Sequence, residues 1–326
     1  MRSSVRLAGV VVLTLAVIVA VMAVTTKRGA AHTTNTAAPA TTARHSTAAA
    51  TPTPAPSATS SPTATPAPTP TPGITVSQTT QSIDVNGATR QYLVVSPSST
   101  TAESLPIVVV LGGIQASVQL ELSRDGLVPL VQAGAAELIY PVGYNESWNA
   151  GGCCGDAAYT GVDDPTFITA LVATVDPGHN VPIYLVGYSN GGRLAYTLAC
   201  GNPSLFDAYA IVKAVPLTPC AAQAPINILQ IAATDDWEVP YQPGDSGDVW
   251  PPVTEQVGLL QQSNGCDPPS TTTVTGSLTY QTWVSCAQGT RLAFATYADG
   301  SQHLWPAGDA ATPNAADVIE RFFGMS

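Results

Sequence analysis

The sequence has 326 residues, and only 10% of them are charged. All 22 acidic residues lie at or after Asp84, and only six basic residues follow residue 73, so the segment 74–326 has a net charge of −16. So acidic a surface repels phosphate backbones, which argues strongly against a function in binding nucleic acid.

The N-terminal residues 1–28 are predicted to be a signal peptide or a signal anchor. Arg2 and Arg6 precede an apolar run over 7–24 that contains no charge, which is the pattern of an export signal. Eighteen apolar residues are also just enough to span a bilayer as a helix, and residues 21–23 offer a cleavage site. We therefore expect either secretion or a membrane attachment that leaves the rest of the chain outside the cell.

Residues 29–73 have the composition of a disordered linker. Of these 45 residues, 39 are Thr, Ala, Pro or Ser. The segment therefore has too few large apolar side chains to form a core. The Pro-rich part favours an extended polyproline conformation. The remaining segment, 74–326, is long enough for one large α/β domain, which we expect to be a monomer.

Six cysteines, all within the predicted domain, indicate an oxidising compartment. They are Cys153, Cys154, Cys200, Cys220, Cys266 and Cys286, and six cysteines allow 15 pairings. Cys266 and Cys286 bracket a short Thr-rich segment that resembles a strand, and this pairing is favoured. The adjacent Cys153 and Cys154 lack both a Cys-x-x-Cys spacing and a nearby histidine, so we expect neither a metal site nor a cofactor.

The predicted elements alternate between strands and helices. A hairpin turns at Asn86 and Gly87, where an Asn-Gly pair favours a tight turn. Further strands are predicted at 107–111, 137–141, 183–186, 226–231 and 292–297, and helices at 117–134, from 164 onward, at 191–200 and at 314–323. This alternation predicts a mostly parallel sheet covered by helices on both faces, with the functional site at the C-terminal ends of the strands.

Residues 187–191 read Gly-Tyr-Ser-Asn-Gly and match the pattern Gly-x-Ser-x-Gly. The pattern alone is weak, and a plain Gly-rich turn is the alternative. However, an apolar strand precedes it and a helix-forming run follows, which is the strand–turn–helix context of a nucleophile elbow. Ser189 is therefore the candidate nucleophile.

A serine hydroxyl needs a neighbouring base, and elimination selects His303. His32 and His45 lie in the linker. His179 precedes the strand that carries Ser189, so it lies at the wrong end of the sheet. His303 follows the strand 292–297, as a histidine at the C-terminal edge should.

The orienting carboxylate is expected after the strand 226–231, where Asp235 and Asp236 are adjacent. Periodicity does not choose between them. An oxyanion hole needs two backbone N–H groups. We expect one from Asn190, directly after the candidate nucleophile, and the second from Ile114, because Gly112 and Gly113 let the backbone approach closely.

These motifs together resemble the secreted polyhydroxybutyrate-depolymerase-type esterases, which are allied to feruloyl and acetylxylan esterases. The resemblance rests on residues 147–155 (Ser-Trp-Asn-Ala-Gly-Gly-Cys-Cys-Gly), 162–164 (Val-Asp-Asp), 187–192 (Gly-Tyr-Ser-Asn-Gly-Gly), 236–241 (Asp-Trp-Glu-Val-Pro-Tyr) and 303–306 (His-Leu-Trp-Pro). It implies an α/β-hydrolase fold and a Ser-His-Asp triad, and the match over 236–241 selects Asp236 over Asp235. The family usually has His-Gly where this chain has Gly112 and Gly113, and the lead-in to His303 also departs from the family's pattern.

The resemblance implies an extracellular serine esterase that acts on polyhydroxyalkanoate-type polyester or on feruloyl or acetyl esters of plant polysaccharide. The short spans between the three catalytic candidates leave little room for a lid, which suits a polymeric substrate. Tyr188, Trp148, Trp237 and Trp305 flank the motifs and are expected either to line a substrate pocket or simply to pack. The alternatives are a cell-envelope acyltransferase on the same triad, a non-catalytic surface protein that binds glycan or polymer, and a protease.

Overall fold

The computed structural model describes residues 74–98, 104–222, 224–245, 250–268 and 271–325. The predicted signal segment 1–28 and the predicted linker 29–73 lie outside these ranges. Within them, no helix is both long enough and apolar enough to cross a bilayer.

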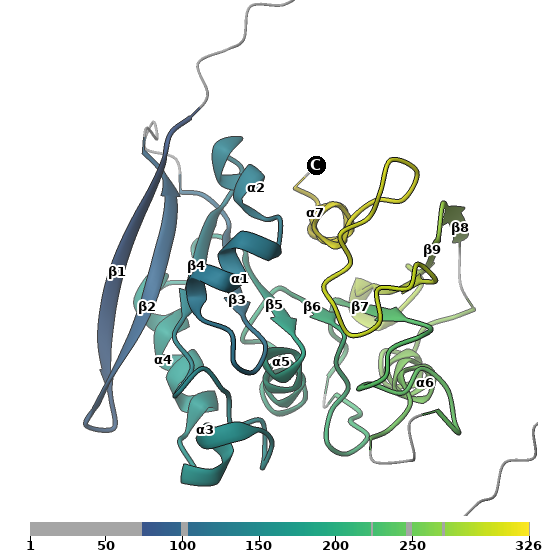
Figure 1. The fold of residues 1–326 in the computed structure, drawn as a ribbon, viewed down its shortest axis with the longest axis horizontal. Helices are drawn as coiled ribbons and strands as arrows, with labels where there is room; N and C mark the ends of the chain where they lie inside the picture. Colours follow the sequence, from purple (N-terminus) through teal and green to yellow (C-terminus); the bar gives the residue numbers. More distant parts are fainter. Residues whose placement is uncertain (1–73, 99–103, 223, 246–249, 269–270, 326) are drawn as a thin grey trace, which may run out of the picture. The chain divides into compact units, whose positions relative to one another are not determined.

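A ten-stranded sheet organises the described part of the chain (Figure 1). Its strands are β1 (Val76–Val85), β2 (Ala88–Pro97), β3 (Ile107–Leu111), β4 (Glu137–Pro141), β5 (Ile183–Tyr188), β6 (Ala208–Val212), β7 (Ile228–Ala233), β8 (Thr271–Thr275), β9 (Leu278–Trp283) and β10 (Leu292–Tyr297). They lie in the order β1-β2-β4-β3-β5-β6-β7-β10-β9-β8. The six central strands, from β4 to β10, run parallel, and an antiparallel pair extends the sheet at each end.

Helices cover both faces of this sheet (Figure 1). They are α1 (Val118–Arg124), α2 (Val128–Gln132), α3 (Gly155–Thr160), α4 (Asp164–Val175), α5 (Asn190–Gly201), α6 (Val253–Ser263) and α7 (Ala315–Phe323). Apolar side chains of α4, α5 and α6 pack in one core, and those of α2 and α7 pack in a second core on the opposite face. The predicted mostly parallel sheet with helices on both faces is confirmed.

Strand β3 explains why the central strands have continuous apolar sequences. All five of its side chains are buried. Ile107, Val109 and Leu111 point into the core beneath α4 and α5, whereas Val108 and Val110 point into the core beneath α2 and α7. A strand buried on both faces needs no polar alternation, which is why this strand could be predicted residue by residue.

The structure corrects the sequence prediction in the segment 117–134. A single helix was predicted there, but the chain forms α1 and α2 with a break between them. Asp125 ends α1, and Gly126 has a φ of +71°, a left-handed conformation that interrupts the helix. The elements β6, α3 and α6 were not predicted, and the one strand-like segment predicted between Cys266 and Cys286 forms two strands, β8 and β9.

The six cysteines form three disulfides in the described residues. Cys266 pairs with Cys286, the pairing that the sequence favoured, and this bond joins the two ends of the segment that contains the β8–β9 hairpin. Cys200 at the end of α5 pairs with Cys220, which follows β6. Cys153 pairs with its neighbour Cys154.

Candidate active site

Ser189 occupies a sharp turn between β5 and α5. Its φ of 52° and ψ of −118° lie outside the regions that L-residues normally adopt, and such strain is typical of functional sites. The flanking glycines allow the turn to close. A Cβ at Gly187 would lie 2.6 Å from Gly191 O, and a Cβ at Gly191 would lie 2.2 Å from Leu111 O. Only glycine fits at these two positions, as expected of a nucleophile elbow.

The structure brings Ser189, His303 and Asp236 together. Ser189 Oγ lies 2.9 Å from His303 Nε2, and His303 Nδ1 lies 3.0 Å from both carboxylate oxygens of Asp236. The side chains of His303 and Asp236 are both largely buried. These three residues come from the C-terminal ends of β5, β7 and β10, which are far apart in the sequence but close in the sheet.

Local hydrogen bonds fix the orientation of the Asp236 carboxylate. Its Oδ1 accepts from the backbone N–H groups of Glu238 and Val239, both at 2.9 Å. The neighbouring Asp235 is exposed, and its Oδ1 accepts from the backbone N–H of Gln302 at 3.3 Å. The structure therefore places Asp236, and not Asp235, against the imidazole.

The predicted oxyanion segment lies against the first turn of α5. The same hypothetical Cβ at Gly191 that meets Leu111 O would also lie 2.5 Å from Gly112 O. The segment that leads to Ile114 is thus adjacent to the N-terminus of the helix that begins at Asn190. Backbone N–H groups and the positive end of a helix dipole favour negative charge at such a place.

No protein-family model matches the chain. A solved acetyl xylan esterase from Aspergillus awamori is similar with a TM-score of 0.54 and 14% identity, over 76% of this chain and 100% of that one. The chain has the α/β-hydrolase fold.

Two curated relatives of this chain carry names of esterases. A protein of Nocardia uniformis subsp. tsuyamanensis named as the esterase NocK is 31% identical over 191 residues, which cover 55% of this chain and 54% of NocK. Feruloyl esterase D of Neurospora crassa is 26% identical over 157 residues, which cover 44% of this chain and 51% of that protein. This chain therefore spans about half the length of the relatives that it matches.

The predicted oxyanion segment is supported by side chains that the sequence analysis missed. Glu121, buried on α1, fills the space beside Gly112, where a Cβ would lie 2.8 Å from Glu121 Oε2. Burial raises the pKa of Glu121, and its ion pair with Arg124 opposes that rise. The Arg124 guanidinium lies 4.5 Å from the centre of the Tyr188 ring, and the Tyr188 hydroxyl donates to His303 O at 2.6 Å. These contacts run continuously from the oxyanion segment to the backbone of His303.

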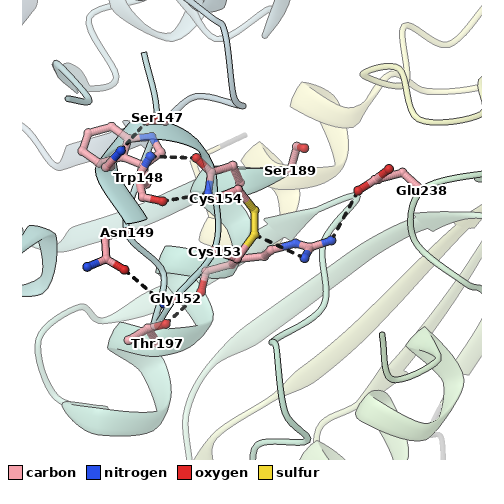
Figure 2. The surroundings of a disulfide bond; sticks show 12 residues. Ser147, Trp148, Asn149, Gly152, Cys153, Cys154, Ser189, Thr197 and Glu238 are labelled. Atoms are coloured by element: carbon pink, nitrogen blue, oxygen red, sulfur yellow. Dashed lines mark hydrogen bonds and ion pairs between the residues drawn. A yellow bond between two sulfur atoms is a disulfide. The ribbon is translucent and has the colours of Figure 1, made fainter. Parts of the chain in front are cut away.

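The Cys153–Cys154 disulfide lies on the loop that contacts α5 (Figure 2). Arg193, in the first turns of α5, donates to Cys153 Sγ at 3.6 Å and forms an ion pair with Glu238 at 3.8 Å. Its guanidinium also lies 3.7 Å from the centre of the Trp250 ring. Burial lowers the pKa of Arg193, and the Glu238 carboxylate opposes this effect. The disulfide, the helix and the segment that follows Asp236 are thus joined through one side chain.

Three aromatic residues predicted to line a substrate pocket are buried. Tyr188, Trp148 and Trp305 are only 2–8% exposed, and the polar groups of Tyr188 and Trp148 bind the backbone of His303 and Gly112. Their burial favours the packing alternative. Trp237, in contrast, is 64% exposed, and its ring centre lies 5.7 Å from that of His303.

Lys213 is a further residue that the sequence analysis did not place at the site. Its side chain is fully buried at the end of β6, and its ammonium donates to Ser301 Oγ at 2.8 Å and to Gln302 O. The sequence alone could have pointed to this residue, since Lys213 interrupts the apolar run 208–215. Within the described residues, no group of three or more His, Cys, Asp or Glu side chains is placed to hold a metal ion.

Proposed function

We propose that this chain is an extracellular serine hydrolase that cleaves carboxylic esters through an acyl-enzyme. The observation that carries the proposal is the hydrogen-bonded series from Ser189 Oγ to His303 Nε2 at 2.9 Å and from His303 Nδ1 to the Asp236 carboxylate at 3.0 Å. The esterase names of two relatives, each matched over about half its length, support the reaction class.

In the proposed reaction, Ser189 Oγ attacks the ester carbonyl while His303 Nε2 takes the hydroxyl proton. Asp236 holds the imidazole in the required tautomer and stabilises the imidazolium that forms. The backbone N–H groups of Asn190 and Ile114 stabilise the tetrahedral oxyanion. His303 then gives the proton to the leaving alcohol, and a water molecule, deprotonated by His303, releases the acid and restores Ser189.

We propose that the acyl group is aromatic or otherwise apolar, as in feruloyl esters or hydroxyalkanoate polyesters. Exposed apolar side chains support this assignment, because Trp237 stands beside His303, and Leu304 follows directly. Ile114, which supplies a proposed oxyanion donor, is also exposed. Apolar side chains beside a reacting group favour apolar substrates by burying them.

The extracellular location is supported by cysteine chemistry. All six cysteines of the sequence are in disulfides, which form and persist in oxidising compartments. The predicted N-terminal export signal is a second, independent reason for this proposal.

The test is to produce the full chain under oxidising conditions and to measure its hydrolysis of p-nitrophenyl acetate, methyl ferulate and a 3-hydroxybutyrate oligomer. The Ser189→Ala variant is the control. Hydrolysis of any of these esters by the wild type and not by Ser189→Ala supports the proposal, and the ratio of kcat/KM values identifies the acyl class. A folded wild-type protein that hydrolyses none of the three contradicts it and favours a non-catalytic binding protein. Faster product formation with an added sugar or alcohol than with water alone would instead identify an acyltransferase.

A further inference from the structure

Lys213 is a buried cation that the proposed reaction does not use. It follows β6 directly, and its side chain is fully buried. Burying an ammonium group costs free energy unless hydrogen bonds and charges compensate it. Its backbone φ of 51° is a left-handed conformation that is uncommon for a residue with a side chain. The buried ammonium group and the left-handed backbone are both unfavourable, so Lys213 is expected to have a specific role.

The ammonium group of Lys213 holds the loop that precedes His303. It donates to Ser301 Oγ at 2.8 Å and to the backbone oxygen of Gln302. Gln302 immediately precedes His303, so this bond fixes the peptide plane one residue from the imidazole. The Gln302 N–H donates on its other side to Asp235 Oδ1 at 3.3 Å. The loop is therefore anchored through both backbone polar groups of Gln302, one in each of its two peptide units.

The backbone around Lys213 also reaches the other two catalytic candidates. Ser189 N–H donates to the carbonyl of Val212, the residue before Lys213, at 3.0 Å. Lys213 N–H donates to Ile231 O at 2.9 Å, within the strand β7 that leads to Asp236. Lys213 and its neighbour Val212 are thus hydrogen-bonded to the three segments that carry the members of the proposed triad.

We propose that Lys213 is a positioning residue that keeps His303 in register with Ser189 and Asp236. This inference rests on the proposed serine-hydrolase function and deepens it. A displacement of about 1 Å in a reacting group can cost on the order of 100-fold in rate. The loop 299–303 is long enough to shift by this amount once its anchor is removed, because it is a turn and not part of the sheet.

The charges around Lys213 give the inference a pH signature. Burial lowers the pKa of Lys213 from 10.5 to about 8, and the carboxylates of Asp236, Asp299 and Asp235, in that order, oppose the shift. Above pH 8 the neutral amine is a weaker donor to the Gln302 carbonyl, so kcat is expected to fall. Stability moves the other way. Between about pH 8 and 10 the unfolded chain binds more protons at this residue than the folded chain does, so its contribution to stability rises with pH.

The decisive variant is Lys213→Met in the full chain, since methionine has a similar length and no charge. We expect its melting temperature to equal or exceed that of the wild type, because a buried charge is replaced by an apolar group. We expect kcat for p-nitrophenyl acetate to fall roughly 10- to 100-fold, with KM changed by less than about threefold. The fall in kcat of the wild type between pH 8 and 9.5 should be absent in the variant.

The control variant is Ser301→Ala, which removes one acceptor of the ammonium group at a less buried position. We expect a smaller fall in kcat and the wild-type pH dependence, because Lys213 still binds Gln302 O. This variant also keeps the inference testable if Lys213→Met fails to fold, since a kcat equal to that of the wild type in Ser301→Ala would then count against it.

The outcomes separate this inference from the proposed function. A wild type that turns over esters, together with a folded Lys213→Met variant of unchanged kcat and unchanged pH profile, overturns the positioning role alone. A parallel loss of kcat and melting temperature in Lys213→Met also overturns it, because that is the behaviour of a purely structural residue. A wild type without turnover overturns the proposed function whatever the variants do.

Discussion

The side-chain amide of Asn190 binds both polar groups of the Trp148 backbone. Asn190 Oδ1 accepts from Trp148 N–H at 2.7 Å, and Asn190 Nδ2 donates to Trp148 O at 3.0 Å. The residue that supplies a proposed oxyanion donor through its backbone therefore also holds the neighbouring loop through its side chain. Trp148 continues the connection, because its Nε1 donates to Gly112 O at 3.0 Å.

The first prediction concerns this side chain. Asn190→Ala keeps the backbone N–H but leaves the buried Trp148 N–H without the amide acceptor, whereas Trp148 O still accepts from Cys154 N–H at 3.0 Å. We expect a loss of about 1–3 kcal/mol in the free energy of unfolding, measured by urea denaturation, and a lower kcat. The matched control is Asn202→Ala at the exposed end of the same helix, where the loss should stay below about 0.5 kcal/mol. Equal losses in the two variants would refute this role of Asn190.

The second prediction distinguishes the two adjacent acids. Asp236→Asn should reduce kcat by roughly 10³- to 10⁴-fold, because the amide cannot stabilise the imidazolium and favours the wrong tautomer. Asp235→Asn keeps an oxygen that accepts from Gln302 N–H, so its kcat should fall by less than about tenfold. Steady-state kinetics with a p-nitrophenyl ester make the comparison. A larger effect at Asp235 would contradict the assignment.

The sequence predicted those residues of the candidate site whose position follows from their order in the chain and from the strand that precedes them. Ser189 and His303 could be selected as catalytic candidates because each follows a strongly apolar strand, and the C-terminal ends of parallel strands meet at one edge. The choice of Asp236 over Asp235 needed the family resemblance, since two adjacent residues in a loop share the same spacing. The two acids differ in their local hydrogen bonds, because the carboxylate of Asp236 accepts from the N–H groups of Glu238 and Val239.

The sequence did not predict contacts between side chains that are distant in the chain. The packing of Glu121 against Gly112 and the bond from Lys213 to Gln302 depend on how loops fold over the sheet, which periodicity does not encode. The same limit applies to the break at Gly126. A single helical stretch was predicted across it, whereas the left-handed backbone at Gly126 follows the end of α1, and α2 begins anew with Pro129 in its first turn.

The third prediction compares two disulfides. The Cys200–Cys220 bond joins residues that are 20 positions apart, so removing it by a double serine substitution should cost about 3 kcal/mol through the entropy of the unfolded chain. Cys153 and Cys154 are adjacent, so their bond closes no loop of chain, and the corresponding double variant should lose less than about 1 kcal/mol. Denaturant unfolding of both variants measures the difference. The reverse order of losses would show that the Cys153–Cys154 bond has a larger structural role than its spacing implies.

The fourth prediction concerns Trp237, the exposed aromatic residue beside His303. Trp237→Ala should raise KM for methyl ferulate by roughly 5- to 30-fold, corresponding to about 1–2 kcal/mol of lost apolar contact, and should change KM for p-nitrophenyl acetate by less than about twofold. The control is Tyr159→Ala on α3, where the side chain is 92% exposed. An equal change in KM for both esters would show that Trp237 does not select the acyl group.

The most direct test of the central claim is covalent labelling of Ser189. A fluorophosphonate reacts with a serine hydroxyl only when a neighbouring base activates it. Intact-mass and peptide mass spectrometry of the full chain should show one adduct per molecule, located on Ser189, and labelling should be lost in Ser189→Ala and at least about 100-fold slower in His303→Ala. A folded wild-type protein that remains unlabelled, or that is labelled equally fast in His303→Ala, would contradict the assignment of Ser189, His303 and Asp236 as a catalytic triad.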